Sequence, residues 1–239
     1  MKVDIRHQPA YAVARCHIPA GQTINVESGA MYAHSLGLNI ESKMEGGLFG
    51  AAKRALLSGD SFFMSKFTAL PNEDGWVDIV PTLPGDIFSA DVSPGNNLIL
   101  TKSVWLASDL GVNLDAKFGG AKSFFGGEGL FLVKAEGRGT IVGTAYGALD
   151  VTTLREGQGI TLDTGHLVAY EEGMRVNVRK AAKGLISSFT SGEGLVMDIY
   201  GPGDVITQSR NPAGFASWIT SLLPSGGSSG GGGVSSLFS

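Results

Sequence analysis

The segment 21–33 reads GQTINVESGAMYA, and two later segments align with it without gaps: 95–107 reads GNNLILTKSVWLA and 157–169 reads GQGITLDTGHLVA. The match continues downstream in all three copies and ends each time on a basic residue. These residues are Lys43, Lys117 and Arg179. Self-similarity at a fixed spacing indicates a chain built from repeated structural units. The three copies therefore predict the architecture before any single residue is considered.

Each copy predicts short strands joined by tight turns. After the first glycine of every copy, apolar residues recur two positions apart, which is the period expected for half-buried strands. The alternating pairs are Ile24 and Val26, Leu98 and Leu100, and Ile160 and Leu162. The glycine itself, Gly21 in the first copy, supplies a turn with positive φ at no steric cost. These features predict an all-β protein.

The copies predict one compact body of three tandem repeats with pseudo-threefold symmetry, covering about residues 1–75, 76–142 and 143–210. An all-β unit of this size buries little surface alone, so the repeats are expected to pack together. The whole body, including a C-terminal helix, is expected to end near residue 223. Residues 224–239 are rich in glycine and serine and are expected to form a flexible tail.

The C-terminal helix is predicted over residues 212–223, with Asn211 as N-cap and Pro212 in the first turn. An apolar stripe follows at the spacing i, i+3, i+4, i+7. It consists of Phe215, Trp218, Ile219 and Leu222. So short a helix is marginal alone in water, so its stripe is expected to be buried by its own β body, a neighbouring subunit or a lipid surface. The polar face carries no bases, which favours a protein over lipid.

Composition narrows the classes of function. The net charge is −4, with 18 basic and 22 acidic residues, which argues against nucleic acid as a partner. Charged residues make up 17 %, below the roughly 25 % of average domains, which suits a protein that hides surface between subunits. Cys16 is the only cysteine, so no intrachain disulfide forms and a reducing compartment is favoured. With no signal-like or membrane-spanning apolar run, we expect a cytoplasmic homo-oligomer.

The sequence predicts no catalytic residue, metal site or cofactor. Its four histidines form no His-x-His pair and do not occupy equivalent repeat positions, so structural roles are favoured over metal ligation. Cys16 lies in a predicted strand and is expected to be a small buried hydrophobe. The match of residues 226–230 to a nucleophile motif falls in the tail, without the strand and helix that motif requires. The glycines of residues 137–143 miss the dinucleotide-binding spacing by one residue.

The connecting segments combine bases with aromatic residues, and together with the helix they form a candidate interaction surface. Its residues are Phe49, Lys53, Arg54, Lys122, Phe124, Phe125, Lys183, Phe189 and Trp218. This composition is typical of a subunit contact or of peripheral contact with a membrane. The alternative is that the aromatic residues plug the ends of the β body.

An acid follows a glycine in each connecting segment. These repeated turn acids are Asp60, Glu128 and Glu193. We expect each carboxylate to accept backbone N–H bonds in its turn, or to pair with a base of the same connector. Convergence of the three carboxylates on a common axis is the functional alternative.

Several motifs resemble a known family. They are GGLFGAAKR at 46–54, SGDSFF at 58–63, SGEGLV at 191–196 and GPGD at 201–204. The chain resembles the bacterial branch of the altered-inheritance-of-mitochondria family, a former domain of unknown function, over about residues 1–223. The resemblance implies three repeats folded like the tryptophan RNA-binding attenuation protein (TRAP-like), a short double-stranded β-helix. It also implies a cytoplasmic bacterial protein, and it transfers no catalytic residues; the mitochondrial members are associated with inner-membrane organisation.

These observations favour a non-enzymatic scaffold or interaction protein that self-associates, with a membrane surface as one setting. The alternative is a small-ligand or RNA-binding module, and a hydrolase comes third. Fold alone does not transfer RNA or tryptophan binding, and the basic residues form no cluster suited to RNA.

Overall fold

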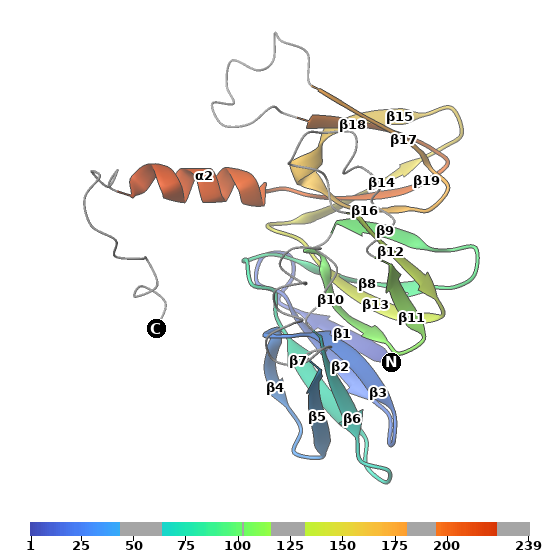
Figure 1. The fold of residues 1–239 in the computed structure, drawn as a ribbon, viewed down its shortest axis with the longest axis vertical. Helices are drawn as coiled ribbons and strands as arrows, with labels where there is room; N and C mark the ends of the chain where they lie inside the picture. Colours follow the sequence, from blue (N-terminus) through green and yellow to red (C-terminus); the bar gives the residue numbers. More distant parts are fainter. Residues whose placement is uncertain (44–63, 102, 116–131, 181–194, 224–239) are drawn as a thin grey trace.

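The computed structural model describes residues 1–43, 64–101, 103–115, 132–180 and 195–223 (Figure 1). In these ranges the protein is predominantly β, with one C-terminal helix, which confirms the predicted β class and the predicted helix. No helix in these ranges is long and apolar enough to cross a membrane.

The first part of the chain forms seven described strands. They are β1 (Lys2–Arg6), β2 (Val13–Ile18), β3 (Thr23–Glu27), β4 (Met31–His34), β5 (Leu38–Lys43), β6 (Met64–Ala69) and β7 (Gly75–Ile79). The middle part forms β8 (Ile87–Val92), β9 (Leu98–Thr101), β10 (Trp105–Asp109), β11 (Val112–Asp115), β12 (Leu132–Gly137) and β13 (Gly139–Thr144).

The last part forms six strands, a short 3₁₀ turn and the helix. They are β14 (Leu149–Leu154), β15 (Gly159–Asp163), η3 (Thr164–His166), β16 (Leu167–Glu171), β17 (Arg175–Lys180), β18 (Leu195–Tyr200), β19 (Gly203–Gln208) and α2 (Pro212–Leu222). In Figure 1 the three parts follow one another along the long axis of the molecule, from blue through green to orange.

The described strands form four sheets, and two of these sheets are shared between neighbouring parts of the chain. Their orders are β1-β2-β7-β4, β5-β6-β3-β10-β13-β8, β11-β12-β9-β16-β19-β14 and β15-β18-β17. The second sheet is joined by the antiparallel pair β3–β10 and the third by β9–β16. The first part of the chain therefore contributes four described strands to one sheet and three to the next, and the middle and last parts each contribute three and three.

The strand registers follow the sequence alignment. Ile24 lies opposite Phe67, Leu98 opposite Ala135, and Ile160 opposite Ile199. On their other side, Phe67, Ala135 and Ile199 lie opposite Ile40, Leu114 and Val176. Pairs β4–β7, β10–β13 and β16–β19 each carry a register shift, and these shifts follow Met31, Trp105 and Leu167, which align in the sequence.

The core consists of three apolar clusters between the faces of the sheets. In the first, Cys16 and Val77 of one sheet pack with Ile24 and Phe67 of the next. The second cluster is centred on β9, β10, β12 and β13, and the third on β16, β18 and β19. Burial of alternate side chains on facing sheets gives each cluster the layered packing of a β-sandwich.

Helix α2 begins after β19 and points away from the sheets (Figure 1). Asn211 is its N-cap, and the Asn211 side chain accepts hydrogen bonds from the backbone N–H groups of Ala213 and Gly214. Pro212 occupies the first turn, where a missing N–H does no harm. The sequence therefore predicted both the start and the cap of this helix.

Candidate functional site

Most residues of the predicted interaction surface lie outside the described residues. These are Phe49, Lys53, Arg54, Lys122, Phe124, Phe125, Lys183 and Phe189. The repeated turn acids Asp60, Glu128 and Glu193 lie outside them as well, and so does the predicted tail at 224–239. Trp218 is the member of the predicted surface that the structure places.

The apolar stripe of α2 is exposed. The exposed fractions are 37 % for Phe215, 56 % for Trp218, 39 % for Ile219 and 63 % for Leu222. The described residues therefore do not show the stripe buried against the protein's own β body, one of the three candidates named from the sequence, because α2 points away from the sheets (Figure 1). Among the candidates named from the sequence, a neighbouring subunit and a lipid surface are left.

One contact ties the stripe to the body. The ring of Phe215 lies 5.7 Å from the ring of Tyr146, and 6.1 Å from the ring of Trp218 on the next turn. Aromatic rings at such distances attract one another beyond the area that they bury. The base of α2 is thereby anchored, while Trp218 continues the aromatic row into solvent.

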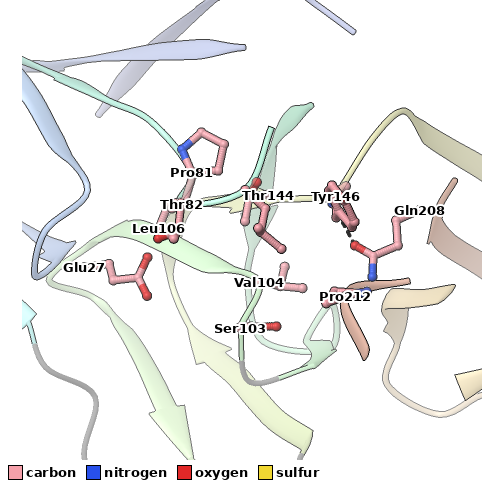
Figure 2. A pocket seen from close by; sticks show the side chains of 12 residues that line it. Glu27, Pro81, Thr82, Ser103, Val104, Leu106, Thr144, Tyr146, Gln208 and Pro212 are labelled. Atoms are coloured by element: carbon pink, nitrogen blue, oxygen red, sulfur yellow. Dashed lines mark hydrogen bonds between the residues drawn. The ribbon is translucent and has the colours of Figure 1, made fainter. Parts of the chain in front are cut away.

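A pocket of about 230 Å³ lies beside the base of the helix (Figure 2). Three parts of the chain line it: Glu27 with the segment 81–83, residues around β10 and β13, and Gln208 with Pro212. The turn at 81–83 places Pro81 and Thr82 on one side, and Figure 2 shows Tyr146 and Gln208 on the other. The pocket therefore lies where the three parts of the chain meet.

Glu27 is the acidic group of this pocket. It ends β3 and is half-buried, and burial raises the pKa of its carboxyl. Burial has this effect because it disfavours the charged form. The other described lining residues have apolar, amide or hydroxyl side chains, so the part of the pocket that the structure describes offers no second carboxylate, histidine or cysteine for acid–base or nucleophilic chemistry.

Gln208 fixes the far side of the pocket. Its Oε1 accepts a hydrogen bond from the backbone N–H of Tyr146 at 2.8 Å, and its Nε2 donates to the carbonyl of Gly165 at 3.0 Å. The Nδ1 atom of His166 lies 2.7 Å from the carbonyl of Gln208. The first bond holds the strand that leads into α2 to the segment after β13, and the other two hold it to η3, so Gln208 serves as a positioning residue for the helix.

Three of the four histidines, His17, His34 and the His166 described above, have structural partners. Nε2 of His17 lies 2.7 Å from a carboxylate oxygen of Asp4, and Nδ1 of His34 lies 2.7 Å from the carbonyl of Ser35. Across the described residues, no group of three or more His, Cys, Asp or Glu side chains is arranged to hold a metal ion. Cys16 is fully buried, as predicted, and burial raises its pKa to about 12.

A charged cluster lies on the first sheet. The carboxylate of Asp78, 3 % exposed, accepts hydrogen bonds from Arg15 and Arg6. The Arg15 guanidinium also lies 3.8 Å from the centre of the Trp76 ring, a cation–π contact. The hydrogen bond from Arg15 is the main cause that lowers the pKa of Asp78. These hydrogen bonds join residues of three strands of the same sheet, β1, β2 and β7, which makes this cluster structural.

Sequence reasoning missed the pocket and the role of Gln208. The sequence offered one signal, the alignment of Glu27 with Thr101 and Asp163. All three residues are polar and stand at the end of the same predicted strand in their copies. That alignment gives no indication that Gln208 and residues 81–83 approach it from distant parts of the chain. The sequence predicted the apolar stripe of the helix, but it gave no indication that the stripe is exposed to solvent.

Known proteins resemble this chain over nearly its whole length. Residues 3–210 match the family described as mitochondrial biogenesis AIM24. An uncharacterized protein of Streptococcus pyogenes serotype M6 is 26 % identical over 232 residues, which cover 94 % of this chain and 92 % of that protein. A crystal structure of a protein from Streptococcus pyogenes is 25 % identical and superposes with a TM-score of 0.73, covering 93 % of this chain and 99 % of that one. The family match confirms the resemblance seen in the sequence, and the chain belongs to the AIM24 family.

Proposed function

We propose that this protein is a non-enzymatic interaction protein that self-associates, and that α2 supplies one of its contacts. The observation that carries the proposal is the exposed stripe of the helix, with Trp218 at its centre. An aromatic side chain surrounded by aliphatic ones is typical of the energetic centre of a protein interface. A helix of 11 residues with such a stripe gains stability from a partner that covers it.

The chemistry of the helix favours a protein partner over a membrane. Its polar positions include Thr220 and Ser221, whose hydroxyls bond the backbone of the preceding turn. No acidic residue occurs in the first turn and no basic residue in the last. A helix that lies on an anionic membrane normally carries bases on its polar face. Peripheral membrane contact is therefore the second setting, and the cytoplasmic location stays a prediction.

The proposal includes the architecture. We propose three tandem TRAP-like repeats, in which the strands around Ile24, Leu98 and Ile160 are equivalent. The matching registers and the repeated register shifts support this equivalence. The proposed first repeat runs to Ile79 rather than to residue 75, because β7 pairs with both β2 and β4. The predicted pseudo-threefold symmetry stays a prediction, because β4 and β15 each lie at the end of a sheet of the described residues and do not close the repeats around an axis.

The pocket supports a second candidate, the binding of a small ligand. Its volume of about 230 Å³ is below the roughly 300–1,000 Å³ of most ligand sites. It therefore suits a small, largely apolar molecule with one group that bonds to Glu27. A thermal-shift screen with and without the substitution Glu27→Gln tests this candidate, and a shift that depends on Glu27 supports it.

Light scattering after gel filtration tests self-association over a range of protein concentrations. We expect the wild type to have a mass above that of one chain, and Trp218→Ala to lower it. Thr220→Ala, on the polar side of the same helix, is the matched control and should leave the mass unchanged. A wild type that is monomeric at every concentration contradicts the proposal, and sedimentation with anionic vesicles that depends on Trp218 would favour the membrane setting instead.

A further inference from the structure

Two sheets each end on a strand whose aligned strands in the other parts of the chain are paired on both sides. Strand β3 pairs with β10, and β9 pairs with β16, so these four strands lie inside their sheets. Strand β15 aligns with β3 and β9, and β4 aligns with β10 and β16, yet in the sheets of the described residues β15 and β4 each lie at an end. We call the pairs β3–β10 and β9–β16, which join neighbouring parts of the chain, junctions. The first part of the chain thus presents one strand of a further junction, β4, and the last part presents the other, β15.

The two junctions inside the chain have the same register. In the β3–β10 junction Ala107 lies opposite Val26 and Ser108 opposite Asn25. In the β9–β16 junction Ala169 lies opposite Leu100 and Tyr170 opposite Ile99. The residues that align with these pairs at the open edges are Ala33 with Leu162, and His34 with Thr161. A third junction of the same kind would therefore place Ala33 opposite Leu162.

Burial differs between the paired strands and the open ones. Trp105 and Leu106 of β10 are 3 % and 1 % exposed, whereas the aligned Met31 and Tyr32 of β4 are 43 % and 67 % exposed. On the other edge, Ile160 is only half-buried, whereas the aligned Ile24 is fully buried. The open edges therefore expose apolar side chains at the positions that a junction covers.

The open edges also carry few of the side chains that usually prevent pairing. Natural edge strands are blunted by charged residues, especially lysine, or by proline. Strand β4 reads MYAH and strand β15 reads GITLD, with Asp163 as the one charged residue of the two. The Asp163 carboxylate is already engaged, since it accepts the backbone N–H of Gly165 at 2.8 Å.

We propose that β15 of one copy of this chain pairs with β4 of a second copy, antiparallel and in the register of the internal junctions. The contact places Ala33 opposite Leu162 and His34 opposite Thr161. It joins two chains in the same way that the pairs β3–β10 and β9–β16 join neighbouring parts of one chain. This inference rests on the self-association proposed above and adds a second contact, distinct from α2.

Backbone geometry fits this pairing. Along a strand, successive backbone N–H groups point to opposite sides. The N–H of Ser35 bonds to Trp76 of β7, so the N–H of His34 points away from β7 to the open edge. The carbonyl of Gln158 accepts from Gly201, next to β18, so by the same alternation the backbone groups of Thr161 point away from β18. His34 and Thr161 are thereby oriented to exchange two hydrogen bonds.

The contact is head-to-tail, because it joins two different surfaces. Such contacts give a closed ring when the rotation between copies closes, and an open filament when it does not. A ring reaches a fixed maximum mass, whereas a filament keeps growing as the protein concentration rises. Both assemblies contain the same β15–β4 junction.

Disulfide cross-linking between two differently tagged full-length chains tests the register. One chain carries Ala33→Cys and the other carries Leu162→Cys; directly opposed residues of paired strands lie within the Cα separation that a disulfide spans. We expect oxidation of the mixture to yield the two-tag dimer, with far less product when Leu162→Cys is replaced by Ile160→Cys. The native Cys16 is buried and does not compete. Equal yields in both mixtures, or no product in either, would overturn the register.

Edge variants test the contact without cysteines. Tyr32→Lys adds a charge to the exposed edge of β4 and should reduce the mass seen by light scattering, while Tyr11→Lys, at an exposed tyrosine outside both edges, should not. His34→Pro removes the outward N–H and should act like Tyr32→Lys, whereas His34→Ala keeps that N–H and should preserve the assembly. Circular dichroism and melting temperature establish that each variant is folded.

The outcomes separate this inference from the proposed function. A wild type that self-associates, with a mass that neither Tyr32→Lys nor His34→Pro changes, contradicts the edge contact and leaves self-association through α2 intact. A wild type that is monomeric throughout contradicts both. A mass that falls in the edge variants and shows the register-specific cross-link supports the junction.

Discussion

Arg15 and Asp78 face each other across the pair β2–β7, where Nε and Nη2 of the arginine each lie 2.8 Å from a carboxylate oxygen. Two parallel bonds of this kind are stronger than bonds between neutral groups, because both partners are charged. Arg6 adds a third bond at 2.9 Å from β1. Asp78 therefore links three neighbouring strands of the first sheet.

Replacing Asp78 by Asn should destabilise the protein by roughly 1.5–3 kcal/mol, because the two arginines lose a charged acceptor in a buried position. Urea unfolding followed by circular dichroism measures the difference. Asp204→Asn is the matched control: its carboxylate accepts one exposed bond from Thr153, so its effect should stay within about 0.5 kcal/mol. Equal effects of the two changes would show that the Asp78 cluster does not hold the sheet together.

At acidic pH, the wild type and Asp78→Asn should differ less in their free energy of unfolding. The hydrogen bond from Arg15 lowers the pKa of Asp78 in the folded state, so this group stabilises the fold above its unfolded pKa of about 3.9 and ceases to do so as the pH falls through the folded value. Unfolding free energies measured at pH 7, 5, 4 and 3 should show a constant difference down to about pH 4 and a smaller one below. A difference that is already lost between pH 7 and 5 would contradict this assignment.

Two glycine-to-alanine substitutions should change the stability of the protein in opposite directions. A Cβ added at Gly85 would meet the backbone carbonyl of Ala145, so Gly85→Ala should destabilise the protein by about 3 kcal/mol. A Cβ at Gly214 would meet nothing nearer than the Asn211 side chain at 3.8 Å, so Gly214→Ala should stabilise α2 by up to about 1 kcal/mol. Thermal unfolding of the two variants beside the wild type measures both effects. A stable Gly85→Ala protein would show that the backbone bridge between Gly85 and Gly147 can shift.

Cys16 should be unreactive in the folded protein. Its thiol is fully buried, and burial raises its pKa to about 12, so little thiolate forms at neutral pH. A thiol reagent at pH 8 should label the native protein only at the rate of unfolding, and should label the protein in guanidinium within seconds to minutes. Rapid labelling of the native state would show that β2 opens locally.

Trp218→Ala should change the stability of the single chain by no more than about 1 kcal/mol. A loss of 3–5 kcal/mol would be expected for a tryptophan in a packed core, but this ring is more than half exposed and contacts Phe215. Urea unfolding at a concentration where the protein is monomeric isolates this effect. A core-like loss under those conditions would show that the helix packs on the body in solution.

The sequence by itself determined the β class, the positions of many strands and the terminal helix. Alternation at Ile24 and Val26 reports a half-buried strand because side chains on a strand point alternately to two faces. Asn211 and Pro212 report a helix start because they satisfy or remove N–H groups of the first turn. The burial of Cys16 followed from the same local pattern. All of these signals lie within a few residues of one another.

Only the tertiary structure decided which strands are shared between sheets and which surfaces are left uncovered. The pairs β3–β10 and β9–β16 join residues far apart in the chain, and no local pattern distinguishes the paired Trp105 from the exposed Met31 at the aligned position. The pocket between Glu27 and Gln208 depends on the same long-range pairing, and so does the direction in which α2 leaves the body. Strand partners are chosen by the burial of whole sheet faces, which sums contributions from the entire chain, whereas a sequence pattern reports only the periodicity of its own segment.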